Sequence, residues 1–445
     1  AFVMLALSEL VSLGVFATNV QIVLRGLLSV TAYDPGALAQ TIVWGAVWYL
    51  YRRAHEGVDL RDYIGATIAL WMSGAGLATF IGAVIRGVTV VSSRQLAATN
   101  DRPIASAVVM FCVGAAIWWV YWIGTTQSAR HTTLWHAYVL LAGVAGGLIA
   151  AIIAASTVLY DGLVWIAGTP SSVDAAAHFH GTPGATGIVI AGVLVWWYHR
   201  TVLADAGRTT RDETRRVYEY LVAGIGLIAA AVGLMILVVA LIESATASAQ
   251  IAGSGAENTL LLAVTLLVVG APVWWFYWAL IRRALREDTF AEVASMTRRV
   301  YLLLLFGVVG VAAVVALLIA VYFFFDDLVS GRLALATLRR MRWGIGVLLS
   351  AGSIAGYHWS VFAAERESMP TDAHRRIVVI GPNIPGLREE IANQFHVRVE
   401  HLVTADTVEV PEVQSVLHAI AGVHGREVAV MVDGLTVRAV ACERE

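Results

Sequence analysis

Three side chains in the segment 168–187 have the types and spacing of a metal site. Asp174, His178 and His180 form an Asp-x3-His-x-His pattern, which offers one carboxylate and two imidazoles. Zinc and copper accept such ligands, and structural zinc sites take four of them. The segment supplies no fourth ligand, so the pattern predicts either a metal site or a set of exposed loop histidines.

An acidic residue stands inside the first long apolar run of the chain. Glu9 shares this run with Asn19 and Gln21. Ionisable residues within a membrane helix are rare, and they mark proton relays, paired charges or polar cavities. We therefore predict that Glu9 is either a functional intramembrane acid or, if the span begins later, a residue close to the lipid headgroups.

A column of charges marks the ends of five apolar runs. It begins with arginines and continues with acids: Arg25, Arg86, Asp161, Glu243 and Asp327. If neighbouring runs bring these ends together, the arginines can pair with the acids in a ring. The alternative is that each charge only ends its own helix in the interfacial layer.

An aromatic signature that recurs five times defines the elements that must position these residues. The last residue of each copy advances by 70, 78, 78 and 81 positions through Tyr51, Tyr121, His199, Tyr277 and His358. Tryptophan and tyrosine collect where membrane helices leave the hydrocarbon, because their rings are apolar and their N–H and O–H groups are polar. Because histidine replaces tyrosine in this column, we predict that His199 and His358 are also interfacial anchors, not haem or metal ligands. The tryptophans predicted as anchors are Trp48, Trp118, Trp119, Trp196, Trp197, Trp274, Trp275 and Trp359.

The composition is that of a membrane protein. The chain is 58% hydrophobic and 14% charged, whereas soluble domains have about 45–50% and about 25%. The mean hydropathy is +0.74, and the net charge of −2 does not favour nucleic acid as a partner. Ten apolar runs are long enough to cross a bilayer: 1–24, 36–53, 63–86, 104–123, 137–161, 184–201, 217–243, 258–282, 301–327 and 342–363.

Two spans per aromatic copy return the chain to the same side of the membrane. The predicted fold class is therefore an all-α polytopic membrane protein with about ten transmembrane helices in five parallel two-helix repeats. The repeat domain covers 1–365, and its units are about 1–57, 58–130, 131–207, 208–290 and 291–365. Just before the last span, the segment Arg332–Arg342 has the pattern of a short interfacial amphipathic helix.

Arginine counts predict the orientation of these spans. The loops after the Trp-rich ends carry fourteen arginines, and the opposite loops carry eight. By the positive-inside rule, the Trp-rich side and both termini face the cytoplasm.

The composition changes after the last span. Residues 366–374 are predicted to be a linker, and residues 375–445 a small cytoplasmic α/β domain of βαβαββ order. Asp433-Gly434 separates two short apolar runs, which is a strong signal for a β-hairpin turn. The order predicts a parallel sheet with one antiparallel edge strand.

The repeated unit resembles a bacterial membrane domain family of unknown function that occurs as tandem hairpins. A tyrosine opens its first helix, as in Arg215-Arg216-Val-Tyr-Glu-Tyr-Leu-Val222, and a Trp-Trp stretch closes its second. Gly270-Ala-Pro-Val-Trp-Trp-Phe-Tyr-Trp278 and Gly192-Val-Leu-Val-Trp-Trp-Tyr-His-Arg200 match that closing stretch. The resemblance covers roughly residues 1–363 and implies a protein of the bacterial cytoplasmic (inner) membrane. It supplies no activity and no catalytic residues.

The spans contain few polar residues, but they contain many small-residue packing faces such as the run from Gly143 to Ala151. We therefore expect a non-enzymatic scaffold, or an accessory subunit of a larger bacterial membrane assembly. Its expected partners are membrane lipid, which we expect to find bound, and other membrane subunits or further copies of the chain. No cofactor is predicted. The alternatives are a small-solute or ion transporter or channel, and a membrane sensor that signals through its α/β tail.

Overall fold

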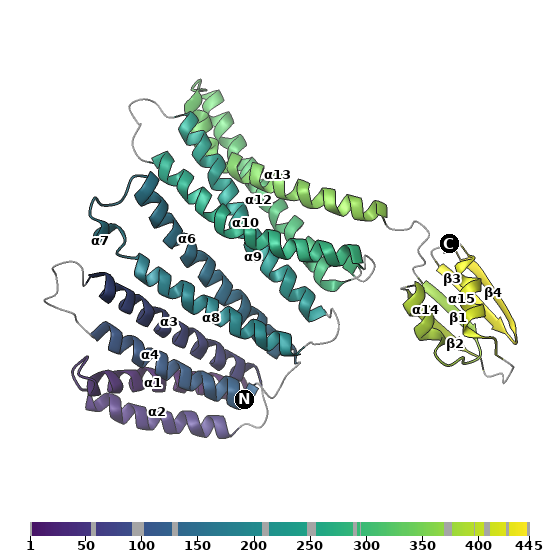
Figure 1. Cartoon of the computed structure of the whole chain (residues 1–445), viewed down its shortest axis with the longest axis horizontal. Helices are drawn as coiled ribbons and strands as arrows, with labels where there is room; N and C mark the ends of the chain where they lie inside the picture. The colour runs from purple at the N-terminus through teal and green to yellow at the C-terminus, as the bar shows by residue number, and fades with distance from the viewer. Residues whose placement is uncertain are drawn as a thin grey trace. The chain divides into compact units, whose positions relative to one another are not determined.

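The structure of the chain is a computed structural model (Figure 1). It describes residues 2–54, 59–90, 102–126, 132–206, 213–246, 255–287, 292–293, 295–368, 376–395, 397–404, 410–423 and 427–442. The internal boundaries of the first four predicted units, and residues 369–374 of the predicted linker, lie outside this part of the chain. Two compact units are present, one of residues 1–281 and 301–352, the other of residues 282–300 and 353–445.

Long helices make up the described part of the chain before residue 369. They and the short helices between them are α1 (Phe2–Leu27), α2 (Pro35–Arg53), α3 (Leu60–Val90), α4 (Arg102–Trp118), η2 (Trp119–Thr126), α5 (Thr133–Ala137), η3 (Tyr138–Ala145), α6 (Gly146–Ala167), α7 (Ala175–His178), α8 (Thr182–Ala206), α9 (Glu213–Ala245), α10 (Gly255–Glu287), α12 (Met296–Val329) and α13 (Leu335–Ser368).

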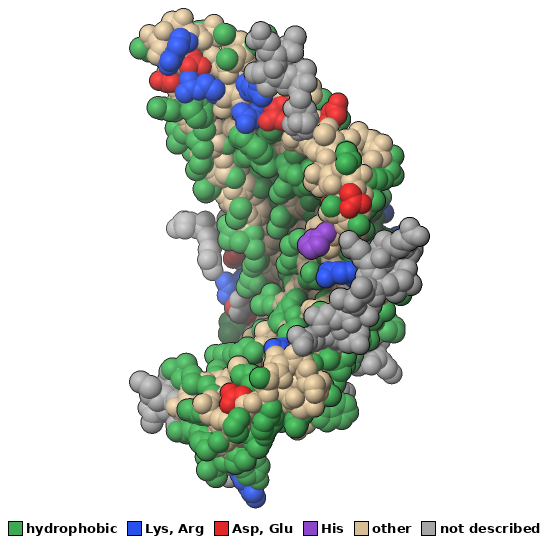
Figure 2. All heavy atoms as spheres, turned by 90° about the vertical axis from the view of Figure 1, so that its left-hand side faces the viewer, with side chains coloured by type: hydrophobic (Ala, Val, Ile, Leu, Met, Phe, Trp, Pro, Cys, Tyr) green, Lys and Arg blue, Asp and Glu red, His purple; other side chains and the backbone are tan. Residues whose placement is uncertain are grey.

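Nine spans in the described residues are long and apolar enough to cross a membrane. Apolar side chains point outward from them, as on α12, where Leu303, Val311 and Leu318 are 73%, 66% and 64% exposed. Figure 2 shows hydrophobic side chains over much of the visible surface, with acidic and basic side chains in small groups. The predicted polytopic helical membrane fold is confirmed.

The tenth predicted span, α2, does not belong to this set. Its sequence contains Gln40 and two arginines, and its many Gly, Trp and Tyr residues lower its hydropathy. The segment Arg332–Arg342 also differs from the prediction. Its residues from Leu335 onward are the first turns of α13, a continuous helix of 34 residues. No separate interfacial helix forms there.

Consecutive long helices pack as hairpins: α1 with α2, α3 with α4, and α6 with α8. Neighbouring hairpins also pack together, through α3 and α8, and Figure 1 shows them side by side. In the third hairpin, Gly147 of α6 meets Gly192 of α8. A Cβ on Gly147 would lie 2.7 Å from the Trp196 backbone nitrogen and 2.8 Å from the Gly192 oxygen. Glycine is therefore needed there for the helix backbones to approach this closely. The predicted fivefold repetition stays a prediction.

Two of the described helical segments have π-helical hydrogen bonding: η2 continues α4, and η3 precedes α6. In η2 the hydroxyl of Thr126 donates to the carbonyl of Tyr121, five residues earlier, at 3.1 Å. The wider turn brings consecutive large side chains inward, so that Tyr121 and Trp122 are both fully buried. Such segments are rare and are often found at functional sites.

The α/β domain has strands β1 (Arg376–Gly381), β2 (Arg398–Val403), β3 (Glu427–Asp433) and β4 (Thr436–Cys442), and helices α14 (Leu387–Phe395) and α15 (Val413–Ala421). The sheet order is β2-β1-β3-β4, with only β4 antiparallel. The hairpin turn contains Gly434 at φ 58°, a backbone conformation that favours glycine. The predicted βαβαββ order is confirmed.

The core of this domain lies on one face of the sheet. Leu387 and Ile391 of α14 and Val416 and Ile420 of α15 pack there against inward-facing strand residues such as Val379. On the other face, Ile380 pairs in register with Leu402 of β2 and Met431 of β3. These three side chains are 36%, 57% and 46% exposed, because both helices lie on the opposite face.

Candidate functional site

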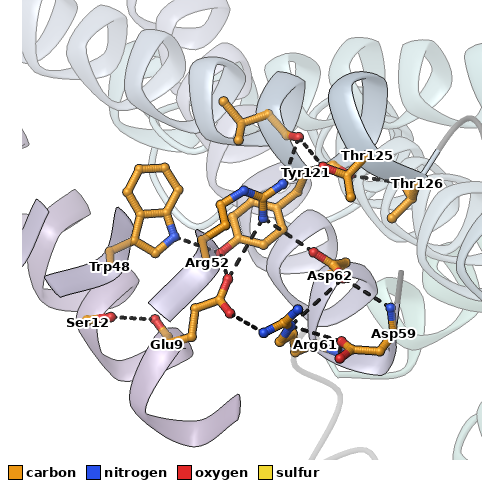
Figure 3. Close-up of polar contacts among 11 residues, drawn as sticks. Glu9, Ser12, Trp48, Arg52, Asp59, Arg61, Asp62, Tyr121, Thr125 and Thr126 are labelled. Carbon is orange, nitrogen blue, oxygen red and sulfur yellow. Dashed lines mark hydrogen bonds and ion pairs between the residues drawn. The ribbon is translucent and has the colours of Figure 1, made fainter. Parts of the chain in front are cut away.

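A buried cluster of charged side chains surrounds Glu9 in the second turn of α1 (Figure 3). Glu9 is 0% exposed. Its Oε2 lies 2.8 Å from an Nη atom of Arg61, and its Oε1 accepts a hydrogen bond of 2.9 Å from the Tyr121 hydroxyl. A buried carboxylate needs such partners, since an unpaired buried charge is strongly unfavourable.

A capping box at the start of α3 positions Arg61. The Asp59 carboxylate accepts from the backbone N–H of Arg61 at 3.0 Å, and the Asp62 carboxylate accepts from the backbone N–H of Asp59 at 3.1 Å. This reciprocal capping fixes the first turn of the helix. The Arg61 side chain, 4% exposed, then lies between the Asp59 carboxylate at 3.1 Å and Glu9.

Arg52, near the C-terminal end of α2, closes the cluster from the opposite side. Its guanidinium lies 4.2 Å from the ring centroid of Tyr121, a cation–π geometry. It also donates to the Asp62 carboxylate at 3.3 Å and to the Thr125 hydroxyl of η2. The indole N–H of Trp48 completes the arrangement by donating to the Tyr121 hydroxyl at 2.8 Å.

Three carboxylates thus share two guanidinium groups, and the cluster ties together the start of α1, the end of α2, the start of α3 and η2 (Figure 3). Of the charged residues in this cluster, the sequence predicted Glu9 alone as a special residue. Arg52 and Arg61 were counted only as contributors to the charge bias between the two sides. The spacing Asp59-x-x-Asp62 before an apolar run is a capping-box signal that could have identified the fixed start of α3.

An aromatic cluster adjoins this site through η2. Trp122, the residue after Tyr121, donates its indole N–H to the Tyr198 hydroxyl of α8 at 2.9 Å. Its ring centroid lies 4.6 Å from that of Tyr138 and 6.0 Å from that of His199. Tyr121 and Trp122, which are consecutive residues of η2, therefore belong to two different clusters. Together the two clusters contain side chains from all three N-terminal hairpins.

The histidines of the aromatic column are buried, which differs from the lipid-facing position expected of interfacial anchors. His199 and His358 are 0% and 2% exposed. The Nδ1–H of His199 donates to the Val195 carbonyl at 2.8 Å, and that of His358 donates to the Ile354 carbonyl at 2.9 Å. Both rings are packing residues of their helices.

The predicted tryptophan anchors fall into two groups. Trp119, Trp197, Trp275 and Trp359 are about 60% exposed, at 62%, 58%, 63% and 61%, as a lipid-facing anchor must be. Trp48, Trp118, Trp196 and Trp274 are only half-buried. In this second group Trp118 donates to the Tyr138 hydroxyl at 2.8 Å, just as Trp48 donates to Tyr121. Trp48 and Trp118 thus bond to the next hairpin, whereas the second tryptophan of each pair, Trp119, Trp197 and Trp275, is exposed.

The two predicted charge-ring acids near the end of the membrane domain have partners outside the predicted set. Glu243 lies 2.8 Å from Arg342, measured between Oε1 and Nε, and Asp327 pairs with Arg340. Both arginines belong to the first turns of α13. The acids therefore tie the ends of α9 and α12 to α13.

The remaining members of the predicted ring have local contacts. Arg25 donates to Gln21, one turn earlier on α1, at 3.2 Å, and Asp161 accepts from the Thr182 hydroxyl at 2.7 Å. Arg86 lines a surface cavity. Within the described ranges neither Arg25 nor Arg86 pairs with an acid of the column, so the ring does not form there.

The predicted metal site does not form either, because its side chains have other roles. The Asp174 carboxylate caps α7 by accepting from the backbone N–H of Ala176 at 3.3 Å. His178 donates from Nε2 to the Asp161 carbonyl at 2.9 Å, and its Nδ1 accepts from the Ser171 backbone N–H at 3.3 Å. No lone pair of His178 is left for a metal. The part of the chain that the structure describes contains no cluster of three His, Cys, Asp or Glu side chains able to hold a metal ion, His180 included.

Replacing Asp174 with alanine or with asparagine separates the capping role from a ligand role. Asparagine caps helices as well as aspartate does, whereas alanine is expected to cost about 1 kcal/mol. We expect the thermal unfolding midpoint of the purified chain to fall for Asp174→Ala and to stay unchanged for Asp174→Asn. An equal loss in both variants would contradict the capping role, since a metal site needs the carboxylate itself.

The comparisons with known proteins concern the second half of the membrane domain, not the Glu9 cluster. No curated protein and no solved structure matches the chain. The matched region runs from the first turn of α9 to the first residue of β1, so it includes α10, α12 and α13 as well. Residues 216–376 match the family model of DUF5671, a domain of unknown function.

Proposed function

We propose that the protein is a non-enzymatic membrane scaffold, or an accessory subunit of a larger assembly, in the bacterial cytoplasmic membrane. The observation that carries this proposal is the enclosure of Glu9. Both of its carboxylate oxygens have a close partner, and the side chain is 0% exposed. An acid that relays protons or contacts a substrate must be reachable, whereas an acid that joins four helical segments is most useful when enclosed.

The positions of other polar side chains also favour a scaffold over a transporter. A conducting path would have to bring Glu9, Asn19, Arg25 and Asp161 to one wet cavity. Glu9 and Arg25 are sixteen residues apart on one helix, which separates them by about 24 Å. Asn19 donates instead to the Val15 carbonyl at 2.8 Å. Each of these groups has its own partner within the protein, as expected of packing residues.

The arginine bias supports an orientation with the Trp-rich ends and both termini in the cytoplasm. Arg52 and Arg61 carry part of that bias, and both are paired with carboxylates in the cluster. Such pairing does not weaken the argument, because acidic residues contribute little to the positive-inside rule. The α/β domain would then lie in the cytoplasm.

A membrane sensor that signals through the α/β domain is the second candidate. One observation favours it: the sheet face with Ile380, Leu402 and Met431 carries exposed apolar side chains, and neither of the described helices of this domain covers it. Large apolar side chains grouped on a surface are typical of interaction sites.

Purification of the tagged chain from its native membrane in a mild detergent tests both candidates. A scaffold should emerge with membrane subunits, or with further copies of itself, in fixed stoichiometry. Reconstituted vesicles should show no more ion flux than empty ones. If deletion of residues 370–445 removes only soluble partners, the sensor is favoured. If the protein emerges alone and conducts an ion, with flux lost in Glu9→Gln, the scaffold proposal is wrong.

A further inference from the structure

A groove lies where α3 ends and where α4 and α8 begin. Its cavity volume is about 260 Å³. The wall from α3 runs from Ala75 to Arg86 and consists otherwise of small side chains, while Pro103 comes from α4 and Gly184 and Ile188 come from α8. In Figure 1 these helix ends lie on the left, which is the side that Figure 2 faces.

The length of the groove matches that of a lipid acyl chain in one leaflet of the bilayer. Ala75 and Arg86 are eleven residues apart on α3, which corresponds to about 16 Å of helix. The hydrocarbon core of a bilayer is about 30 Å thick, so the groove has the depth of about half of it. Its volume is below the roughly 300–1,000 Å³ of pockets for compact small molecules. A single extended chain fits it better than a ring-shaped cofactor does.

The floor of the groove offers almost no polar group to a ligand. The one hydroxyl on its α3 wall, that of Thr79, donates to the Ala75 carbonyl at 2.8 Å and is satisfied within the helix. Ala75, Thr79 and Ile188 are exposed at the surface, so the groove is open along the side of the helices that an apolar span presents to lipid. The walls therefore select an apolar ligand that can enter from the bilayer.

Arg86 supplies a positive charge at the mouth of the groove. It is exposed and lies three residues before the end of the apolar span at Thr89, about 4.5 Å along the helix. An arginine at this depth extends its guanidinium into the headgroup layer. In the described ranges this guanidinium has no carboxylate partner. The nearby Asp161 accepts from Thr182 and does not line the groove.

We propose that this groove binds an anionic phospholipid, with one acyl chain against the small residues of α3 and the phosphate on Arg86. Guanidinium groups bind phosphate oxygens through paired, charge-assisted hydrogen bonds. The α4 helix begins at the same mouth, and the positive end of its dipole adds to the attraction. The length of the groove selects an acyl chain, and the charge of Arg86 selects an anionic headgroup. This site does not depend on the scaffold role.

Two variants test the binding of the lipid acyl chain and the binding of its headgroup separately. A Cβ on Gly184 would meet no atom within 4 Å, so Gly184→Leu can place a side chain on this wall of the groove. Arg86→Gln removes the charge and keeps the groove open. Arg25→Gln is the matched control, because Arg25 also stands at the end of its helix but contacts Gln21 and does not line the groove.

The experiment is native mass spectrometry and thermal unfolding of the full chain in dodecyl maltoside micelles with phosphatidylglycerol or phosphatidylcholine. We expect the wild type and Arg25→Gln to retain phosphatidylglycerol in preference to phosphatidylcholine and to be stabilised by it. Arg86→Gln should bind phosphatidylglycerol roughly tenfold more weakly, the factor that corresponds to about 1.4 kcal/mol. Gly184→Leu should lose retention of both lipids while keeping its own unfolding midpoint in detergent.

Inorganic phosphate serves as the competing probe, since a free anion shares the headgroup chemistry. At millimolar concentration it should neither displace the lipid nor stabilise the protein. Stabilisation by phosphate alone would show an anion site and overturn the lipid assignment. The proposal is also wrong if Arg86→Gln and Gly184→Leu both retain phosphatidylglycerol as well as Arg25→Gln does.

Discussion

Replacing Arg61 with alanine is expected to lower the free energy of unfolding by about 3–5 kcal/mol. The substitution leaves the fully buried Glu9 carboxylate without the guanidinium that lies 2.8 Å away. It also removes the ion pair between the Arg61 guanidinium and the carboxylate of Asp59, the residue that caps α3. The measurement is unfolding of the purified protein by titration with a denaturing detergent, followed by intrinsic tryptophan fluorescence.

Arg53→Ala is the matched control for this prediction. Arg53 follows Arg52 at the end of α2, but its guanidinium is at the surface, and among the described residues it contacts the hydroxyl and ring of the exposed Tyr49. Its loss should change the free energy of unfolding by no more than about 0.5 kcal/mol. In a double-mutant cycle, Glu9→Gln combined with Arg61→Ala should cost less than the two single costs together. Equal effects of Arg61→Ala and Arg53→Ala would show that the cluster is not stabilising.

The second large effect is expected at the contact between α6 and α8. A Cβ at Gly147 would lie 2.7 Å from the backbone nitrogen of Trp196, a distance that forces the two helices apart. Overpacking of this kind costs about 1–3 kcal/mol in well-packed interiors. We expect Gly147→Ala to lower the free energy of unfolding in the same titration, although alanine is the better helix former.

Gly162, on the same helix, provides the control. A Cβ there would meet no other atom within 4 Å. Gly162→Ala should therefore stabilise the protein by about 0.4–1 kcal/mol through the lower entropy of the unfolded chain. The decisive result is that the two substitutions change the free energy of unfolding in opposite directions. If Gly147→Ala is also stabilising, the helices are not in close contact at this position.

The fold could be predicted largely from the sequence because the length of each apolar run and the aromatic residues near its end can be read from a short stretch of sequence. Each long apolar run became a helix, and Asp433-Gly434 correctly marked the hairpin of the α/β domain. One of these helices, α2, is not among the nine candidate membrane spans in the described residues, because its aromatic and glycine content makes it less apolar than the other predicted spans. Its helical character was predictable, but its position depends on packing against α1.

The candidate site was only partly predictable, because its contacts join residues far apart in the chain. Glu9 was conspicuous as an acid in an apolar run, but its partner Tyr121 is 112 residues away. The π-helical turn that directs Tyr121 inward leaves no periodic signal in one sequence. For Asp174 the pattern left two interpretations open, since the same carboxylate position serves a helix cap as well as it would serve a metal.

The order in which the cluster is synthesised has a consequence for biogenesis. Glu9 leaves the ribosome 52 residues before Arg61 and 112 residues before Tyr121. Until those partners arrive, an ionised Glu9 lacks the Arg61 guanidinium at 2.8 Å and keeps only the longer contact of 3.8 Å with Arg52 of its own hairpin. We therefore expect the first hairpin to reach its final depth less readily by itself than together with the second. Truncation after residue 57 should leave a hairpin that inserts poorly, although most of its own residues are apolar.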